Sequence, residues 1–236
     1  MIKPKVNSIR IVIVILILLV AIGRPRQGHA GPASSGPTTY CLPKLSELIQ
    51  QEDNGKALAL IELGADVDQT DTYGRTPLIV ACAKRRPSYD VIKALIRKEA
   101  DVNAADHYGS TALGFAVDSQ DLIMTELLLK AGADVNRASF IGNTALVMAA
   151  ENADADWRLL KLLIEHGGDV NRKGRLCSTA LMVVSGKGDR HIVQYLLDAG
   201  ATAEIRDEAG RTALDYARER HRTEVVSILQ AVRMHK

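Results

Sequence analysis

Two short phrases recur in step along this chain. The first reads DTYGRTPLIVACA at 71–83 and returns four more times, and the second reads LGADVDQ at 63–69 and returns with it. The threonines of the first phrase are 35, 33, 35 and 33 residues apart: Thr76, Thr111, Thr144, Thr179 and Thr212. A period near 33 residues predicts a stacked array, in which each unit buries its apolar face against the next unit.

The composition fits a stack better than one thick core. Hydrophobic residues make up 47% of the 236 residues, but aromatic residues only 4%. A compact domain of this size normally fills its core with more aromatic side chains. Thin repeats need only small aliphatic ones, because each repeat packs on a close neighbour.

The repeated columns predict a turn and two helices in each unit. A Gly column, beginning at Gly74, supplies turns with a positive φ, and the Thr column that follows places a hydroxyl at a helix start. Pairs of Leu and Ile then mark a second helix, which ends at glycines such as Gly132. An Asp column (Asp71, Asp106 and Asp207) is expected to accept backbone hydrogen bonds between neighbouring turns.

These columns resemble the ankyrin-repeat family. Its pattern is an Asp, a Gly, then Thr-Pro-Leu-His, Leu-Leu and Gly-Ala-Asp-Val-Asn, and Thr76, Pro77 and Leu78 match it. The leucine column continues at Leu113, Leu146, Leu181 and Leu214. The family's His is replaced in every repeat, by Ile79, Gly114, Val147, Met182 and Asp215.

The resemblance covers residues 41–236 and implies an all-α fold, an ankyrin-repeat solenoid of helix-turn-helix units with β-hairpin-like tips. We expect an N-terminal cap at 41–70, repeats at 71–105, 106–138, 139–173 and 174–206, and a C-terminal cap at 207–236. The first and third repeats carry extra residues between their helices, around 86–89 and 153–157. Trp157, in the second insertion, either anchors a partner or packs on its own repeat.

The first 30 residues read as an export signal. Basic residues precede an apolar run at 11–22, and small residues follow at Gly28 and Ala30, which predicts a secretory signal peptide at 1–30. Twelve apolar residues are fewer than the ~20 that span a membrane. The alternative is an uncleaved N-terminal membrane anchor, because Arg24 and Arg26 lie inside the cleavage region.

A flexible linker at 31–40, rich in Gly, Pro and Ser, follows the signal. The protein is therefore expected to be periplasmic or secreted, with the bacterial periplasm fitting best and an exported eukaryotic protein as the alternative. A membrane is a partner only if the N-terminal segment stays uncleaved.

The sequence contains no motif that predicts chemistry. It lacks CxxC, HExxH and GxSxG, and its six histidines are scattered. Removing residues 1–30 leaves 25 basic and 28 acidic residues, which is no surplus for binding nucleic acid. We expect no catalysis, no metal, no cofactor and no nucleic-acid partner.

The three cysteines are predicted to play different parts. Cys82 occupies a small buried position of a first helix. Cys41 and Cys177 lie in turns several repeats apart, too far for a disulfide, because packed helices are about 8–10 Å apart and a disulfide needs Cα atoms within about 7 Å. Cys177 also replaces the turn glycine, which predicts a distorted tip in its repeat.

The positions left free by the scaffold are the tips, where an apolar residue precedes the Gly column. On a concave face formed by the tips and first helices, we expect these apolar anchors for a protein partner: Tyr73, Tyr108, Phe140, Ile141 and Leu176. The partner would be oriented by four polar residues: Arg75, His107, Asn143 and Arg175. The alternative is that neighbouring tips only stack on each other.

The leading hypothesis is a non-enzymatic, exported protein-protein interaction module. One alternative is a periplasmic inhibitor or immunity-type protein that neutralises a secreted hydrolase or toxin. A further alternative is an envelope stress factor that supports a redox enzyme through Cys41 or Cys177.

Overall fold

A computed structural model describes residues 44–139, 141–152 and 156–234. The predicted signal peptide and linker, together with Cys41 and Phe140, lie outside these residues. The described helices, in chain order, are α2 (Leu45–Gln50), α3 (Asn54–Glu62), α4 (Pro77–Cys82), α5 (Tyr89–Arg97), α6 (Ala112–Asp118), α7 (Leu122–Lys130), α8 (Ala145–Glu151), α9 (Trp157–Glu165), the 3-10 helix η1 (Arg175–Cys177), α10 (Ala180–Lys187), α11 (Arg190–Asp198), α12 (Ala213–Glu219) and α13 (Thr223–Met234).

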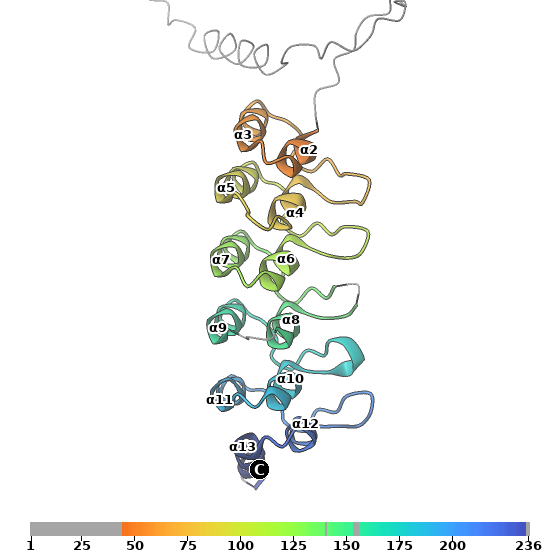
Figure 1. The fold of residues 1–236 in the computed structure, drawn as a ribbon, viewed down its shortest axis with the longest axis vertical. Coiled ribbons are helices and arrows are strands. Elements are labelled where there is room, and N and C mark those ends of the chain that lie inside the picture. The colour runs from red at the N-terminus through yellow and green to blue at the C-terminus, as the bar shows by residue number, and fades with distance from the viewer. Residues whose placement is uncertain (1–43, 140, 153–155, 235–236) are drawn as a thin grey trace, which may run out of the picture. The chain divides into compact units, whose positions relative to one another are not determined.

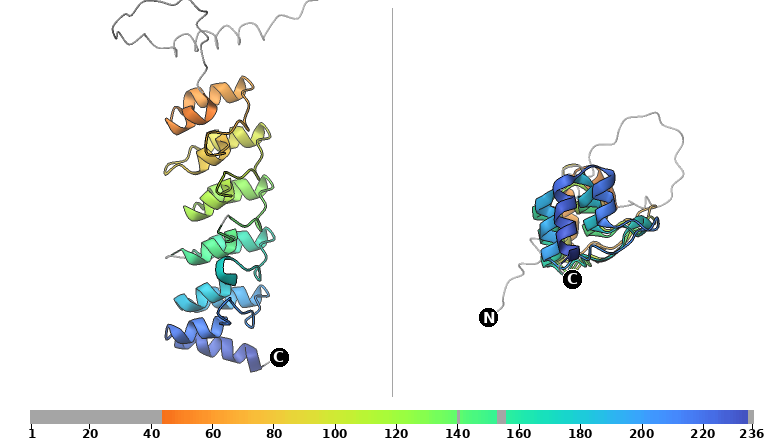
Figure 2. Two further views of the ribbon diagram at one scale, coloured as in Figure 1. Left: turned by 90° about the vertical axis from the view of Figure 1, so that its right-hand side faces the viewer. Right: turned by 90° about the horizontal axis from the view of Figure 1, so that it is seen from below.

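Helix pairs are stacked along one axis in the unit from residue 44 onward. The first helices, from α2 to α12, form a row beside the tips, and the second helices, from α3 to α13, form the row on the far side (Figure 1). Seen along the axis, successive pairs lie over one another and the tips project to one side (Figure 2). The predicted all-α solenoid is confirmed, and β pairing in the described residues is limited to one bridge between Ala105 and Thr111.

The Thr column starts the first helices, as predicted. The Thr76 hydroxyl accepts a hydrogen bond from the backbone N–H of Ile79, and the other four threonines cap their helices in the same way. Such a cap contributes about 1 kcal/mol to stability, because it satisfies an N–H that the helix itself leaves free.

The second helices also have local start and stop signals. From α3 to α11 they begin after a capping Asp or Ser, such as Asp121, whose carboxylate accepts from the N–H of Met124 at 2.9 Å. Most are followed by a glycine with positive φ, such as Gly132 at 90°. Glu99 occupies this position after α5 with a φ of 60°, so the backbone is strained there.

One continuous core lies between the two rows of helices. Leucines such as Leu95, Leu128 and Leu163 are fully buried, each contributing about 1.5–3 kcal/mol. The small residues Ala116 and Ala149 are equally buried and let neighbouring first helices approach closely. None of the helices in the described residues is long and apolar enough to cross a membrane.

Side-chain amides link each repeat to the next. Asn136 Oδ1 accepts from the N–H of Asp169 at 2.8 Å, and its Nδ2 donates to the Gly167 carbonyl at 2.9 Å. Asn103 and Asn171 repeat both hydrogen bonds one unit before and one unit after. These hydrogen bonds hold the segments that follow the second helices of successive repeats in register.

The expectation for the Asp column is wrong. Asp71 Oδ1 accepts from the N–H groups of Tyr73 and Arg75 in its own tip, at 2.8 and 3.0 Å. Asp106 and Asp207 do the same in their tips. The tip folds back on this residue, so the donors two and four residues later are nearer than those of the next repeat.

Candidate protein-binding face

The tips expose a row of apolar side chains at equivalent positions. Their exposed fractions are 54% for Tyr73, 63% for Tyr108, 56% for Ile141 and 57% for Leu176. We call these four residues the tip ladder. Ala209, at the same position of the last tip, is also exposed. Apolar groups that the scaffold leaves in water at regular intervals are typical of an interaction surface.

Neighbouring tips are joined through backbone groups rather than through the tip ladder. The N–H of His107 donates to the Tyr73 carbonyl at 3.0 Å, and the N–H of Glu208 donates to the Leu176 carbonyl at 3.1 Å. The His107 ring packs against Gly74, where an added Cβ would lie 2.4 Å from a ring carbon. Stacking of the tips therefore uses the backbone and His107, which leaves the ladder side chains exposed.

The predicted orienting residue Arg75 is engaged within its own tip. Its Nε donates to Asp71 Oδ2 at 2.8 Å, and its guanidinium lies 5.0 Å from the centre of the Tyr73 ring. Burial acts to raise the pKa of Asp71, but the hydrogen bonds from Arg75 and from the Tyr73 N–H outweigh it and lower this pKa. Arg75 thus stiffens the tip and fixes the position of Tyr73.

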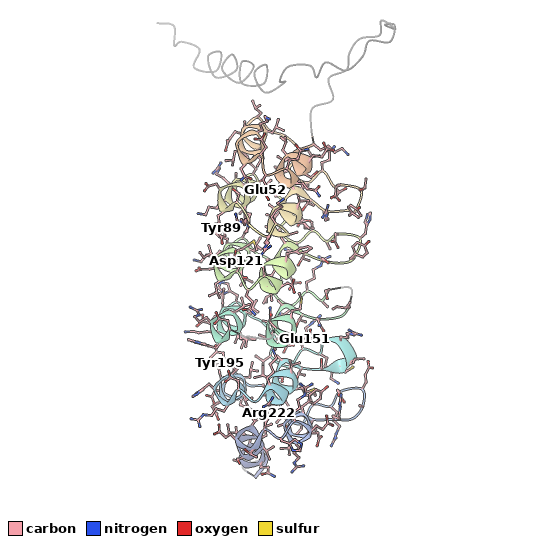
Figure 3. The ribbon with its side chains drawn as sticks, viewed as in Figure 1. Glu52, Tyr89, Asp121, Glu151, Tyr195 and Arg222 are labelled. Carbon is pink, nitrogen blue, oxygen red and sulfur yellow. The ribbon has the colours of Figure 1, made fainter. Side chains whose placement is uncertain are left out.

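Asn143 does not lie on the exposed face, which corrects its expected role in orienting a partner. Its exposed fraction is 2%. Its Nδ2 donates to Glu151 Oε2 at 2.7 Å, and its Oδ1 accepts from the N–H of Arg175 at 2.7 Å (Glu151 is labelled in Figure 3). Asn143 therefore connects the third tip to α8 and to the fourth tip.

The fourth tip is distorted, as the replacement of its turn glycine predicted. Leu176 and Cys177 both have a φ of 56°, and the short helix η1 takes the place of the regular turn. Arg175 and Leu176 are exposed there, whereas Cys177 is half-buried with Sγ 3.9 Å from Glu208 Oε1. The remaining predicted anchor, Phe140, lies outside the described residues.

A cavity of about 180 Å³ opens between the second and third repeats, where the tips meet the first helices. We call it the repeat-two pocket. Its walls include Ser110, Phe115, Asp118 and Met148. Sequence reasoning missed Phe115 and Met148, which stand four residues after the capping Thr. That position is apolar or aromatic in every repeat (Val80, Phe115, Met148, Val183 and Tyr216), a signal that resembles an ordinary core column.

The cysteines differ in their surroundings. Burial, helped by the charge of Asp121, raises the pKa of the Cys82 thiol to about 12, so this thiol stays protonated. Asp121 in turn accepts a hydrogen bond of 2.7 Å from the Tyr89 hydroxyl (Figure 3). The redox alternative therefore depends on Cys177, or on Cys41 outside the described residues, and stays a prediction. No group of His, Cys, Asp or Glu in the described part of the chain could hold a metal ion.

Trp157 is exposed at the start of α9. Its exposed fraction is 53%, and Lys161 Nζ lies 5.8 Å from the ring centre. The ring is thus covered in part by its own helix and open to solvent in part. The helix that it begins, α9, lies in the row of second helices, on the other side of the first helices from the tips (Figure 1).

Comparison with known proteins gives one family. A family model described as ankyrin repeats (3 copies) matches residues 45–139 and 146–234. No curated protein matches the chain.

Solved structures with the same architecture are numerous. The ankyrin-repeat protein EF0377 is 32% identical with a TM-score of 0.73, covering 81% of this chain and 98% of its own. The ankyrin repeat domain of Bcl-3 is 29% identical with a TM-score of 0.69, covering 79% and 81%. A chain in the complex of the Bd0816 predatory endopeptidase from Bdellovibrio bacteriovorus with immunity protein Bd3460 is 27% identical with a TM-score of 0.66, covering 79% and 96%.

Proposed function

We propose that this chain, which belongs to the ankyrin-repeat family of protein-interaction modules, is an exported, non-enzymatic protein. It binds a protein partner through its tip ladder. The binding face would consist of the tip ladder and the adjoining sides of the first helices. The observation that carries this proposal is that all four ladder side chains are more than half exposed at equivalent places in successive repeats.

The tips are held in place before any partner arrives. Carboxylates such as Asp71 and Asp106 fix individual tips, and the hydrogen bond from His107 to the Tyr73 carbonyl fixes two tips to each other. A partner therefore meets side chains whose backbone is already ordered, and little further conformational entropy is lost on binding. Truncating a well-packed aromatic anchor of this kind typically costs 2 kcal/mol or more of binding free energy, roughly a thirtyfold loss of affinity.

Export is part of the proposal. It is supported by the order of basic residues, apolar run and small residues in 1–30. N-terminal sequencing of the protein recovered from its cell envelope or culture medium tests it. A mature N-terminus near residue 31 supports a cleaved signal peptide, whereas an intact N-terminus in the membrane fraction supports the anchor.

The test of the binding face is crosslinking in cells followed by affinity capture of the tagged full-length protein. The triple variant Tyr73→Ala/Tyr108→Ala/Ile141→Ser, called the ladder variant, removes three of the four ladder side chains and keeps Leu176. A matched control, Leu63→Ala/Ile123→Ser, removes exposed apolar side chains from the second-helix side, where their exposed fractions are 47% and 59%. Circular dichroism and thermal unfolding establish that both variants are folded.

We expect the wild type and the control variant to capture the same protein and the ladder variant to lose it. If the folded ladder variant still captures that protein with unchanged yield, the tips are scaffold and the proposal is wrong. Loss only in the control variant would place the binding surface on the second helices instead.

A second candidate is an immunity-type inhibitor. The observation that favours it is the similarity, over 79% of this chain, to a chain in the complex of an endopeptidase with its immunity protein. The test is to express the chain together with any secreted peptidase encoded beside its gene and to measure peptidase activity. Inhibition that is lost in the ladder variant would support this candidate, and full peptidase activity in the presence of a stoichiometric amount of the chain would exclude it for that peptidase.

A further inference from the structure

In the C-terminal unit, an arginine of the tip packs against the first helix, on the face formed by the tips and first helices. Arg211 Nε donates to Asp207 Oδ2 at 3.0 Å, and Nη2 donates to the Tyr216 hydroxyl at 3.0 Å. The guanidinium lies over the Tyr216 ring, 4.6 Å from its centre, and Nη1 lies 3.3 Å from Glu219 Oε2. One guanidinium is thus held between a tip carboxylate, an aromatic ring and a carboxylate at the end of the first helix.

The second repeat has the same frame without the arginine. Counted from the capping threonine, Asp106, Phe115 and Asp118 stand where the C-terminal unit has Asp207, Tyr216 and Glu219. The place of Arg211 is taken by Ser110. Serine has no nitrogen donor and a much shorter side chain, so it cannot bridge the two carboxylates of the frame.

The space that the arginine would occupy is open. Ser110, Phe115 and Asp118 all line the repeat-two pocket. Its volume of about 180 Å³ is roughly ten times what one water molecule needs. The pocket can therefore accept a chain of several heavy atoms.

The carboxylate of Asp118 has no hydrogen-bond or ion-pair partner within the described residues. The equivalent carboxylates of the third repeat and of the C-terminal unit are both engaged. Glu151 accepts from Asn143 Nδ2 at 2.7 Å, and Glu219 is paired with Arg211. In each of those units the donor comes from the residue just before the capping Thr, the position that Ser110 occupies in the second repeat.

The other charged groups in the pocket wall are already engaged. Arg137 Nη1 donates to the Asn103 carbonyl at 2.9 Å, and Asp134 Oδ1 accepts from the N–H of Asn136 at 2.9 Å. The two charges are of opposite sign, so they leave the negative charge of Asp118 uncompensated.

We propose that the repeat-two pocket binds the guanidinium of an arginine side chain supplied by the protein partner. The inference rests on the proposed function and names the chemistry that the partner presents beside the tip ladder. The guanidinium stacks against Phe115 and donates to Asp118, as Arg211 does with Tyr216 and Glu219. Arginine fits better than lysine, because a planar guanidinium with several donors can stack on the ring of Phe115 and hydrogen-bond to Asp118 at the same time.

The first test needs no partner, because the substitution Ser110→Arg supplies the missing side chain from within. We expect this variant to unfold about 1–3 °C higher than the wild type, the effect of one new partly exposed ion pair in a domain of this size. The gain should disappear when Asp118→Asn is added. Ser110→Lys is the matched control and should give a smaller gain. A Ser110→Arg variant with an unchanged or lowered midpoint, or a gain that survives Asp118→Asn, would contradict the proposed geometry.

The second test uses N-acetyl-arginine methylamide as the probe in an NMR titration of the ¹⁵N-labelled full chain. We expect saturable shift changes at the amides of Gly109, Thr111 and Gly114, which line the pocket. The neutral isostere N-acetyl-citrulline methylamide should leave these amides unchanged. Asp118→Asn should weaken binding about tenfold, the loss of one charge-assisted hydrogen bond, and Ser110→Arg should abolish it.

The inference fails if citrulline produces the same shifts, if no amide of the pocket shifts saturably, or if Ser110→Arg still binds the probe. These results are independent of the capture experiment. An arginine-binding pocket together with a ladder variant that keeps its partner would overturn only the role of the ladder. If the ladder variant loses its partner and the pocket does not bind the arginine probe, only the inference of an arginine-binding pocket is overturned.

Discussion

The column of asparagines that links successive repeats makes a quantitative prediction, because one position of this column lacks half of the usual hydrogen bonds. Asn103, Asn136 and Asn171 each accept one backbone N–H of the next repeat and donate to one backbone carbonyl. Asp68 stands in the same column and accepts from the N–H of Asp101 at 2.9 Å, but its carboxylate cannot donate to the carbonyl of Glu99. We therefore expect Asp68→Asn to stabilise the stack and Asn136→Asp to destabilise it.

The magnitudes follow from the hydrogen bonds gained and lost. Asp68→Asn adds one amide-to-carbonyl hydrogen bond and should raise the free energy of unfolding by about 0.5–1.5 kcal/mol. Asn136→Asp removes the hydrogen bond of 2.9 Å to the Gly167 carbonyl and places a carboxylate against that oxygen, so it should cost about 1–3 kcal/mol. In a domain of 150–250 residues, 1 kcal/mol corresponds to a shift of about 2–4 °C in the unfolding midpoint.

Urea unfolding followed by circular dichroism measures both changes, and hydrogen exchange at the Asp169 amide reports the local effect. That amide donates to Asn136 Oδ1, which Asn136→Asp keeps as an acceptor. Its protection should therefore fall less in Asn136→Asp than in Asn136→Ala, which loses both hydrogen bonds. The reasoning is refuted if Asp68→Asn lowers the unfolding free energy, or if Asn136→Asp leaves it unchanged.

Three further predictions concern single residues. Gly74→Ala should destabilise the protein by about 2–3 kcal/mol, because the φ is 75° and the new methyl group would lie 2.4 Å from an atom of the His107 imidazole. Gly210→Ala has a φ of 76° but no atom within 4 Å of the new methyl group, so it should cost only the roughly 1 kcal/mol of the strained backbone. Thermal unfolding of the two variants compares these costs. Burial acts to raise the pKa of Asp207, but the hydrogen bonds that its carboxylate accepts outweigh burial and lower this pKa. The carboxylate therefore contributes stability at pH values above its unfolded pKa of about 4, and this contribution is lost as the pH falls below that value. The urea midpoint should therefore fall less steeply between pH 5 and pH 3 in Asp207→Asn than in the wild type, and equal slopes would contradict this. In a Cys41→Ser background, a thiol reagent at pH 8 should modify Cys177 in the native protein and leave Cys82 unmodified until the protein unfolds, and rapid labelling of Cys82 would show that its burial is wrong.

The sequence was sufficient to predict those features that are decided by neighbouring residues. The capping role of Thr76 and the turn at Gly74 depend only on atoms within a few residues along the chain. The sequence of each repeat is therefore enough to predict its own cap and turn. The same holds for the distorted fourth tip, because Cys177 stands where a positive φ is required. Repetition adds to this, since five versions of one pattern separate the scaffold columns from the variable positions.

Features that depend on the next repeat could not be predicted in this way. Asn143 occupies a tip position, but the N–H of Arg175 and the carboxylate of Glu151 draw its side chain inward. Phe115 lies in a column that is apolar or aromatic in every unit, so its sequence signal does not show that one unit leaves a space beside it. In the C-terminal unit, Arg211 of the tip lies over Tyr216, whereas the much shorter Ser110 leaves Phe115 lining a pocket.

Two departures from the scaffold pattern meet at the same place on the inner face. Ser110 stands where the C-terminal unit has Arg211, which packs against its first helix. Ser139 stands where the first, second and last tips have the aspartate that fixes the tip. The Ser139 hydroxyl is buried without a hydrogen-bond partner among the described residues, and Ser139 lines the repeat-two pocket together with Ser110. Each change forgoes a hydrogen-bonding group that other tips have, and such local conflicts in a protein tend to mark functional positions. Both serines line one pocket, next in sequence to the exposed ladder residues Tyr108 and Ile141, which is the reason to look for the partner at the second and third repeats first.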